Sequence, residues 1–156
     1  MHIVLEGPDN AGKSVLARYI ASRIGRTIVP SEGPEKYPGE INERIDRYFG
    51  FKDVVFDRHP CVSETIYGRL RGRGNVDPFL LLRFYEERPL FIYCRGRDLD
   101  GHVVKAHDTA EHLATVKSNH DRLCRLYDAW ALDKAHIVYR VGDSMENIVT
   151  LVRSLI

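Results

Sequence analysis

The stretch EGPDNAGKS (residues 6–14) decides the fold, because it combines a glycine, four further residues and Gly-Lys-Ser. It follows the short apolar run HIVLE (2–6), which predicts a buried strand. It precedes an amphipathic segment that predicts a helix from Ser14 to a terminating Gly25. A glycine-rich loop between a strand and a helix is the placement that phosphate binding requires. The alternative is a tight strand-to-helix turn with a solvated lysine.

The residues of this loop have separate expected roles. Gly7 and Gly12 allow the backbone to curl so that successive N–H groups point inward, and the following helix adds its dipole. Lys13 would reach the β- and γ-phosphates of ATP, and Ser14 would hold Mg²⁺. The ATP-binding residues expected from the motif are Gly7, Asn10, Ala11, Gly12, Lys13 and Ser14.

Apolar runs alternate with amphipathic segments along the rest of the chain. Strands are predicted at 27–30, 53–57, 89–94 and 136–141. Helices are predicted at 40–49, 61–71, 77–87, around 113–130 and after a capping box formed by Asp143 and Glu146. Continuously apolar strands of this kind indicate a parallel sheet covered on both faces. The sequence therefore predicts an α/β fold of three layers in one domain, residues 1–156, with five parallel strands, helices on both faces and a small lid at 95–109.

Composition narrows the possible partners and the compartment. The 23 basic and 22 acidic side chains nearly cancel, so the overall charge indicates neither nucleic acid nor a membrane surface. The three cysteines form no CxxC pair, which favours reduced thiols and a cytoplasmic protein. The first apolar run is too short for a signal peptide, and the histidines and cysteines show no zinc-ligand spacing.

The run DVVFD (53–57) ends on a carboxylate that is followed by an arginine. A carboxylate at the carboxyl end of a buried strand lies in the crevice where open parallel sheets bind ligands. Asp57 is therefore a candidate metal ligand together with Ser14. Arg58 offers a planar two-pronged donor, suited to an acceptor phosphate and to the charge that develops on a transferred group. The alternative is a surface ion pair that caps the strand.

Three segments resemble the thymidylate kinase group of P-loop nucleoside monophosphate kinases: EGPDNAGKS (6–14), PSEGPEKYPGE (30–40) and DRHPCVSETIYG (57–68). The resemblance implies a P-loop kinase fold and transfer of phosphate from ATP, with Mg²⁺, to a deoxynucleoside monophosphate, dTMP-like or of broad specificity. It further implies an acceptor site in which Asp9 faces the sugar and Arg58 the phosphate. The acceptor-binding residues expected in this way are Asp9, Glu32, Arg44, Phe49, Arg58 and Tyr67.

The same resemblance leaves the base open. Tyr67, with one of Tyr48, Phe49 or Phe51, is expected to stack on the base. Members of that group usually carry a longer segment between the second and third strands, whereas only about a dozen residues separate Glu40 from Asp53 here. Ser31 also stands where the group usually has an arginine. The base pocket is therefore expected to be trimmed or rebuilt.

Phosphoryl transfer needs a cation besides Lys13 and Mg²⁺, because negative charge spreads over the transferred group. Some thymidylate kinases supply an arginine from within the loop, where this chain has Asn10. We therefore expect the lid to supply it, through Arg95 and Arg97. The competing arginines are Arg69, Arg71 and Arg73, and the alternative for the whole set is a solvated rim.

Two other functions stay open. A deoxynucleoside kinase would phosphorylate a 5′-hydroxyl and needs a general base, for which Glu32 is the candidate. A non-catalytic nucleotide-binding module would use the loop alone, while a GTPase switch is disfavoured because no Asn-Lys-x-Asp segment is present. The expected partners are ATP and a deoxynucleoside monophosphate, with a homodimer left open.

Overall fold

The computed structural model describes residues 1–72, 74–96 and 110–156. Strands and helices alternate as the sequence predicts. The elements are β1 (Ile3–Glu6), α1 (Lys13–Ile24), β2 (Ile28–Val29), α2 (Glu40–Tyr48), β3 (Val55–Asp57), α3 (Pro60–Arg71), α4 (Pro78–Glu86), β4 (Leu90–Cys94), α5 (Ala110–Lys134), β5 (Ile137–Tyr139) and α6 (Met145–Leu155). No described helix, α5 included, is long and apolar enough to cross a membrane.

The five strands form one parallel sheet in the order β2-β3-β1-β4-β5, which confirms the predicted fold class. β1 lies in the middle, where Ile3 aligns with Val55 of β3 and with Leu90 of β4. The chain builds the sheet first on one side of β1 and then on the other. Ligands bind at the carboxyl ends of the strands where such a reversal occurs, and that edge carries the glycine-rich loop.

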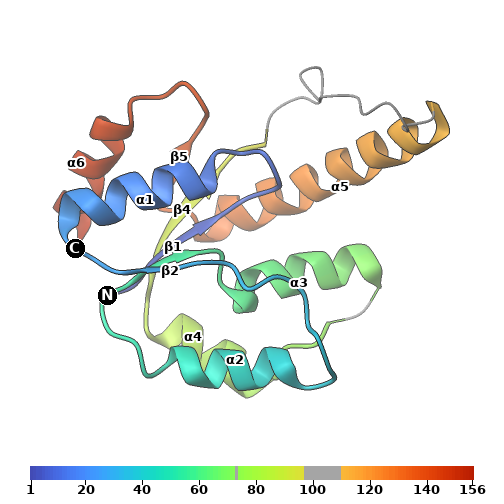
Figure 1. Ribbon diagram of the computed structural model, residues 1–156, viewed down its shortest axis with the longest axis horizontal. Helices are drawn as coiled ribbons and strands as arrows, with labels where there is room; N and C mark the ends of the chain where they lie inside the picture. Colours follow the sequence, from blue (N-terminus) through green and yellow to red (C-terminus); the bar gives the residue numbers. More distant parts are fainter. Residues whose placement is uncertain (73, 97–109) are drawn as a thin grey trace.

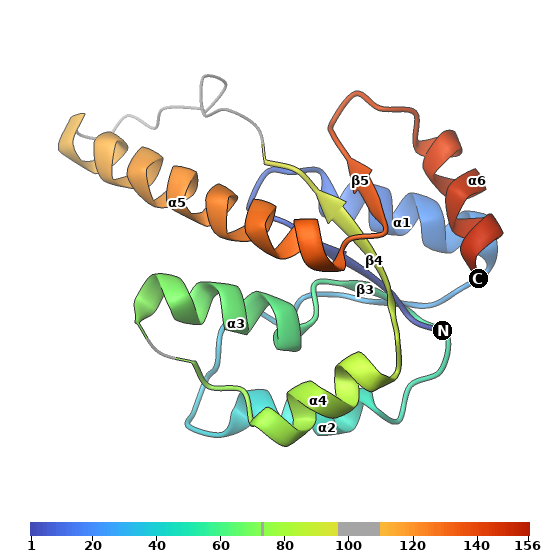
Figure 2. The same cartoon turned by 180° about the vertical axis from the view of Figure 1, so that it is seen from behind.

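Helices cover both faces of the sheet (Figure 1). Ile3 and Leu5 of β1 pack toward α1 and α6, in a core that includes Leu16 and Val149. Val4, between them, packs on the opposite face with residues of α2, α3, α4 and α5. Seen from behind, α5 and α3 lie side by side on that second face, with α2 and α4 beyond them (Figure 2). The alternation of side chains along one strand thus builds two cores.

Two helix ends test the predicted boundaries. Gly25 ends α1 in a left-handed conformation (φ 70°), as predicted. The predicted capping box at Asp143 is wrong, because Ser144 is the N-cap of α6 and its hydroxyl accepts the N–H of Asn147 at 3.3 Å. Asp143 instead closes the preceding turn, where Oδ2 accepts the N–H of Arg140 at 2.8 Å. Because the Asp143 carboxylate is hydrogen bonded within the turn, Ser144 caps the helix instead.

Candidate active site

The loop between β1 and α1 curls through three residues with positive φ. These are Gly7 (152°), Asn10 (59°) and Gly12 (75°). A Cβ on Gly7 would lie 2.0 Å from the carbonyl oxygen of Cys94 in β4, so any other residue would clash with the sheet backbone. Gly12 is the N-cap of α1 and has no side chain to occupy the first N–H groups of the helix. Those groups remain available to an anion.

Lys13 lies folded into this loop. Its side chain is largely buried, and Nζ donates to the carbonyl oxygen of Pro8. Burial is the main cause that lowers the pKa of Lys13, followed by the charge of Arg58. The ammonium is therefore folded back onto the backbone of the loop.

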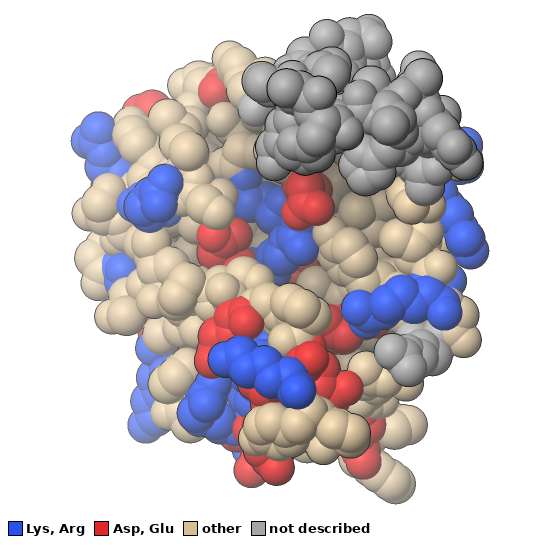
Figure 3. Space-filling view, turned by 45° about the vertical axis from the view of Figure 1, so that its right-hand side comes forward, with Lys and Arg blue, Asp and Glu red and all other residues tan. Residues whose placement is uncertain are grey.

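A cavity of about 540 Å³ opens beside the loop. Its lining consists of Asp9, Asn10, Ala11, Gly12, Lys13, Ser14, Val15, Ser31, Asp57 and Arg58. Figure 3 shows basic and acidic side chains gathered around a hollow on one face of the molecule, in keeping with this mixed lining. The cavity brings together every expected ATP-binding residue except Gly7, which underlies the loop.

Ser14 and Asp57 meet at this cavity, as expected for a metal pair. Ser14 Oγ donates to Asp57 Oδ2 at 2.5 Å. Ser14 lies at the start of α1, and Asp57 is the last residue of β3. Mg²⁺ prefers oxygen ligands and is commonly held by one or two protein oxygens plus substrate phosphates and water. The two side chains fit that donor set. Among the described residues, no group of three or more His, Cys, Asp or Glu forms a metal site.

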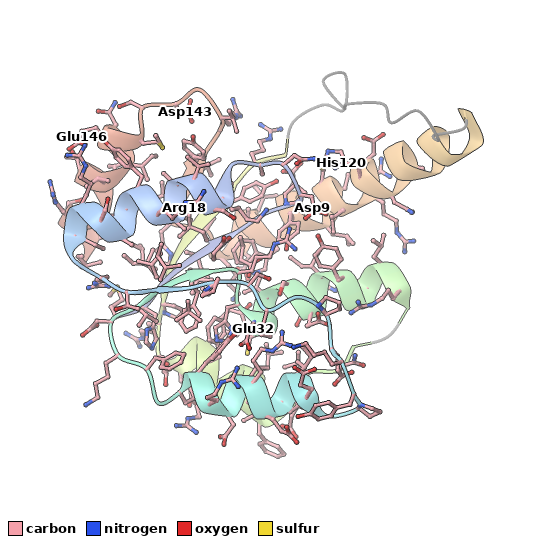
Figure 4. All side chains as sticks on the ribbon, in the orientation of Figure 1. Asp9, Arg18, Glu32, His120, Asp143 and Glu146 are labelled. Atoms are coloured by element: carbon pink, nitrogen blue, oxygen red, sulfur yellow. The ribbon has the colours of Figure 1, made fainter. Side chains whose placement is uncertain are left out.

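Arg58 lines the same cavity and reaches the loop. Its backbone is left-handed (φ 70°), and Nη2 donates to Asp9 Oδ1 at 2.7 Å and to the Gly7 carbonyl at 3.2 Å. Nη1 donates to the hydroxyl of Tyr67 at 3.1 Å. The structure thus groups Arg58, Asp9 and Tyr67, all three of which were predicted to bind the acceptor. Figure 4 shows Asp9 on the loop between β1 and α1.

A second, enclosed space of about 20 Å³ adjoins Arg58 and has room for one water. Glu32 and Arg44 line it together with Ser31 and Arg58. Figure 4 shows Glu32 beside α2, from which Tyr48 and Arg47 both donate to its carboxylate, Arg47 at 2.6 Å. The hydrogen bond from Tyr48 is the main cause that lowers the pKa of Glu32, and the bond from Arg47 acts in the same direction. Glu32 is therefore held as an anion.

Arg44 is almost fully buried within α2. Nη1 donates to the carbonyl of Gly33 at 2.7 Å, and Nη2 pairs with Glu40 at 2.9 Å. Its Nε lies 3.8 Å from Glu32. The arginine thus ties the loop after β2 to α2 and reaches the same small space as Arg58.

The remaining predicted residues lie elsewhere. Phe49 is absent from the described lining of both cavities and lies under Arg83, whose guanidinium carbon is 3.9 Å from the ring centroid. Arg95 lines a separate cavity of about 280 Å³ against α5, with Nε 3.8 Å from Asp128. Arg97 and most of the predicted lid, as well as Arg73, lie outside the described residues. The lid assignment stays a prediction.

The competing arginines also have their own positions. Arg71 pairs with Glu64 at 2.7 Å, and Arg69 lines a further cavity between α3 and α4. Neither is among the described residues that line the cavity beside the loop.

Sequence analysis missed Glu6, the last residue of β1. Its side chain is fully buried, and it accepts the N–H of His59 at 2.7 Å and the hydroxyl of Tyr127 at 3.0 Å. Burial raises the pKa of Glu6 to about 7. The available signal was an acidic residue at the end of an otherwise apolar run.

No protein-family model matches this chain, and no curated protein sequence does either. Solved structures match its fold over almost the whole length. The YorR protein of Bacillus subtilis, in complex with phosphorylated GDP, has a TM-score of 0.67 at 20% identity, over 99% of this chain and 95% of that one. Deoxyadenosine kinase of M. mycoides, with dCMP and dCDP, has a TM-score of 0.59 at 19% identity, over 99% and 97%. Shikimate kinase of Acinetobacter baumannii, with shikimate, has a TM-score of 0.51 at 16% identity, over 99% and 91%.

These matches show that the chain has the fold of P-loop kinases. At such identities they show the fold alone, so the activity has to be argued from the site.

Proposed function

We propose that this protein transfers phosphate from ATP to a deoxynucleoside monophosphate. The observation that carries the proposal is the presence of two cations at one cavity, Lys13 in the loop and Arg58 directly after β3. Lys13 and the N–H groups of the loop suit the donor phosphates. Arg58, already hydrogen bonded to Asp9, suits a second phosphate that faces the first.

Each of the other grouped residues has a role in this proposal. Ser14 and Asp57 would hold Mg²⁺, which neutralises charge on the donor phosphates when it is bound. Asp9 would accept a hydrogen bond from the sugar of the acceptor, and Tyr67 would orient Arg58 through its hydroxyl. The chain's own contribution is to place two phosphates in line and to screen their repulsion.

Glu32 favours a phosphate acceptor over a hydroxyl acceptor. A hydroxyl needs a base to take its proton, whereas a monophosphate already carries ionised oxygens. The hydrogen bonds from Tyr48 and Arg47 stabilise the anionic form of Glu32 and so make it a weaker base. The carboxylate is better suited to hold Arg44 and α2 in position than to remove a proton.

A second candidate function is phosphorylation of a deoxynucleoside. It is favoured by the position of Glu32, which lines the same small space as Arg58. The M. mycoides neighbour is a deoxyadenosine kinase, and its structure holds a monophosphate and a diphosphate, dCMP and dCDP. The YorR neighbour also holds a nucleotide. These ligands support a nucleotide substrate without separating the two candidates.

The deciding experiment presents the purified protein with ATP, Mg²⁺ and each deoxynucleoside or deoxynucleoside monophosphate, and separates the products by chromatography. We expect a diphosphate from at least one monophosphate and no product from any unphosphorylated deoxynucleoside. Lys13→Ala is the control for a contaminating kinase. Product from deoxynucleosides alone would establish the second candidate instead.

A further inference from the structure

Glu6 is a buried carboxylate that the proposed mechanism does not use. It ends β1 directly before the glycine-rich loop, and none of its side chain is exposed. Oε1 accepts the backbone N–H of His59 at 2.7 Å, and Oε2 accepts the hydroxyl of Tyr127 at 3.0 Å. Both oxygens are therefore engaged, one by the segment between β3 and α3 and the other by α5.

The bond to His59 bears directly on Arg58, because this N–H belongs to the peptide that follows Arg58. A non-glycine residue keeps a left-handed backbone only where its surroundings hold it, and Arg58 has φ 70°. The N–H of Arg58 itself donates to the carbonyl of Leu5 at 3.0 Å. Two consecutive residues of β1 thus hold the peptides before and after Arg58, one through its backbone and the other through its side chain.

This backbone geometry decides where the guanidinium points. In the observed conformation it reaches Asp9 and the carbonyl of Gly7, on the loop itself. Because the peptides on both sides are held, the rotation about the N–Cα bond of Arg58 is fixed at the observed φ. A different φ would swing the Cα–Cβ bond and move the guanidinium away from the cavity. The bond from Tyr127 fixes the other end of the Glu6 carboxylate against α5, which packs beside α3 (Figure 2).

We propose that Glu6 is a positioning residue for phosphoryl transfer: by holding the N–H of His59, it keeps Arg58 aimed at the acceptor phosphate. The proposal rests on the proposed function, because it assigns Arg58 to the acceptor. A general role of Glu6 in the core would instead affect both substrates, since the carboxylate lies next to the loop that holds ATP.

Two conservative variants separate the effect of side-chain length at Glu6 from the effect of its charge. Glu6→Gln keeps the length of the side chain, so its carbonyl still accepts from His59 while its amide meets the Tyr127 hydroxyl. Glu6→Asp keeps the charge and is one methylene shorter, so it no longer spans to His59. We expect Glu6→Asp to raise the KM for the monophosphate about tenfold and to leave the KM for ATP within about threefold. Glu6→Gln should leave both constants within about threefold. Equal increases for the two substrates in Glu6→Asp, or equal effects of the two variants, would overturn the proposal.

A double-mutant cycle tests whether Glu6 acts through Arg58. In an Arg58→Ala background, Glu6→Asp should raise the monophosphate KM no further, because the group that it positions is already gone. Multiplication of the two separate effects would show that Glu6 acts on its own and would contradict the inference. Thermal melting of each variant establishes that the compared proteins are folded.

Amide hydrogen exchange at His59 provides a readout that does not depend on activity. Protection of this N–H should persist in Glu6→Gln and fall at least about tenfold in Glu6→Asp. Loss of protection without a rise in the monophosphate KM would overturn the role in positioning. A wild-type chain that phosphorylates no deoxynucleoside monophosphate would instead overturn the proposed function and with it the catalytic part of this inference. The two failures are therefore distinguishable.

Discussion

The loop proposed to face the donor and the segment proposed to face the acceptor are built by different means. The donor loop takes its shape from backbone, through the left-handed Gly12 and the contact of Gly7 with the Cys94 carbonyl. The acceptor segment, from the loop after β2 through α2, is held by side chains. Examples are the bonds from Tyr48 and Arg47 to Glu32. One region is therefore specified locally, and the other only after distant residues have packed.

This difference has an energetic side. Arg47 is 56% exposed and Glu32 35%, so water and salt weaken their attraction. Gly7, by contrast, packs against the backbone of β4, an interior strand of the sheet, where water and salt do not weaken the contact. We therefore expect single substitutions to have larger effects on the donor side than on the acceptor side.

The largest effect is expected for Lys13→Ala. The ammonium is buried in the loop, and no other lysine or arginine belongs to the described loop residues 7–14. Loss of one charge contact to the transition state costs about 10²-fold to 10³-fold in rate. Steady-state kinetics should show this fall in kcat with an unchanged melting temperature. Lys52→Ala, at an exposed position, is the matched control, and an active Lys13→Ala enzyme would refute the assignment of the loop.

Glu6 joins the two regions and should make stability depend on pH. Its folded pKa is about 7, above the ordinary 4.5, so the folded state binds the proton more tightly than the unfolded chain. Stability from this group is present below pH 4.5 and is lost as the pH rises toward 7. Urea unfolding at pH 5 and pH 8 should show wild type losing more stability than Glu6→Gln, by up to about 3 kcal/mol. Glu86→Gln, at an exposed site, should lose as much stability as wild type. Identical losses in all three proteins would contradict the raised pKa of Glu6 in the folded state.

Arg58→Ala probes the boundary between the regions. Removal of charged hydrogen bonds of this kind costs about 1.5–3 kcal/mol, which corresponds to about 10-fold to 100-fold in the KM for the monophosphate. The KM for ATP should stay within about threefold, because Arg58 is proposed to bind the acceptor and not ATP. Arg88 also has a left-handed backbone (φ 48°) but is exposed, so Arg88→Ala controls for the strain and the lost charge. An equal rise in the KM for ATP would place Arg58 on the donor side.

Glu32→Gln should have the smallest effect, about threefold in turnover of the monophosphate, because Tyr48 and Arg47 can still donate to a neutral amide oxygen in place of the carboxylate. Glu43→Gln is the matched control, since Glu43 is also an exposed carboxylate that accepts a tyrosine hydroxyl, that of Tyr37 at 2.5 Å. A loss of several orders of magnitude in Glu32→Gln alone would identify Glu32 as a general base and the acceptor as a hydroxyl.

The same contrast explains what sequence could predict. The loop at 6–14 was predictable because glycine, lysine and serine at fixed spacing act through local backbone geometry, and the five strands because each is a continuous apolar run. The position of Phe49 under Arg83 was not predictable, because it depends on how α2 and α4 pack together. Glu6 was missed for the same reason, since its partners His59 and Tyr127 lie in distant parts of the chain. Asp143 was misassigned because a turn and a helix competed for one carboxylate.

The central place of β1 has a consequence for folding. Ile3 pairs with Val55 on one side and with Leu90 on the other, so β1 is completed only when β4 exists. At about 5–20 residues per second, a ribosome takes roughly 5–20 s to make a stretch of about 90 residues. During that time the strand that carries the glycine-rich loop has synthesised neighbours on one side at most. The glycine-rich loop, which packs against β4 at Gly7, therefore takes its final shape late in the folding of this chain.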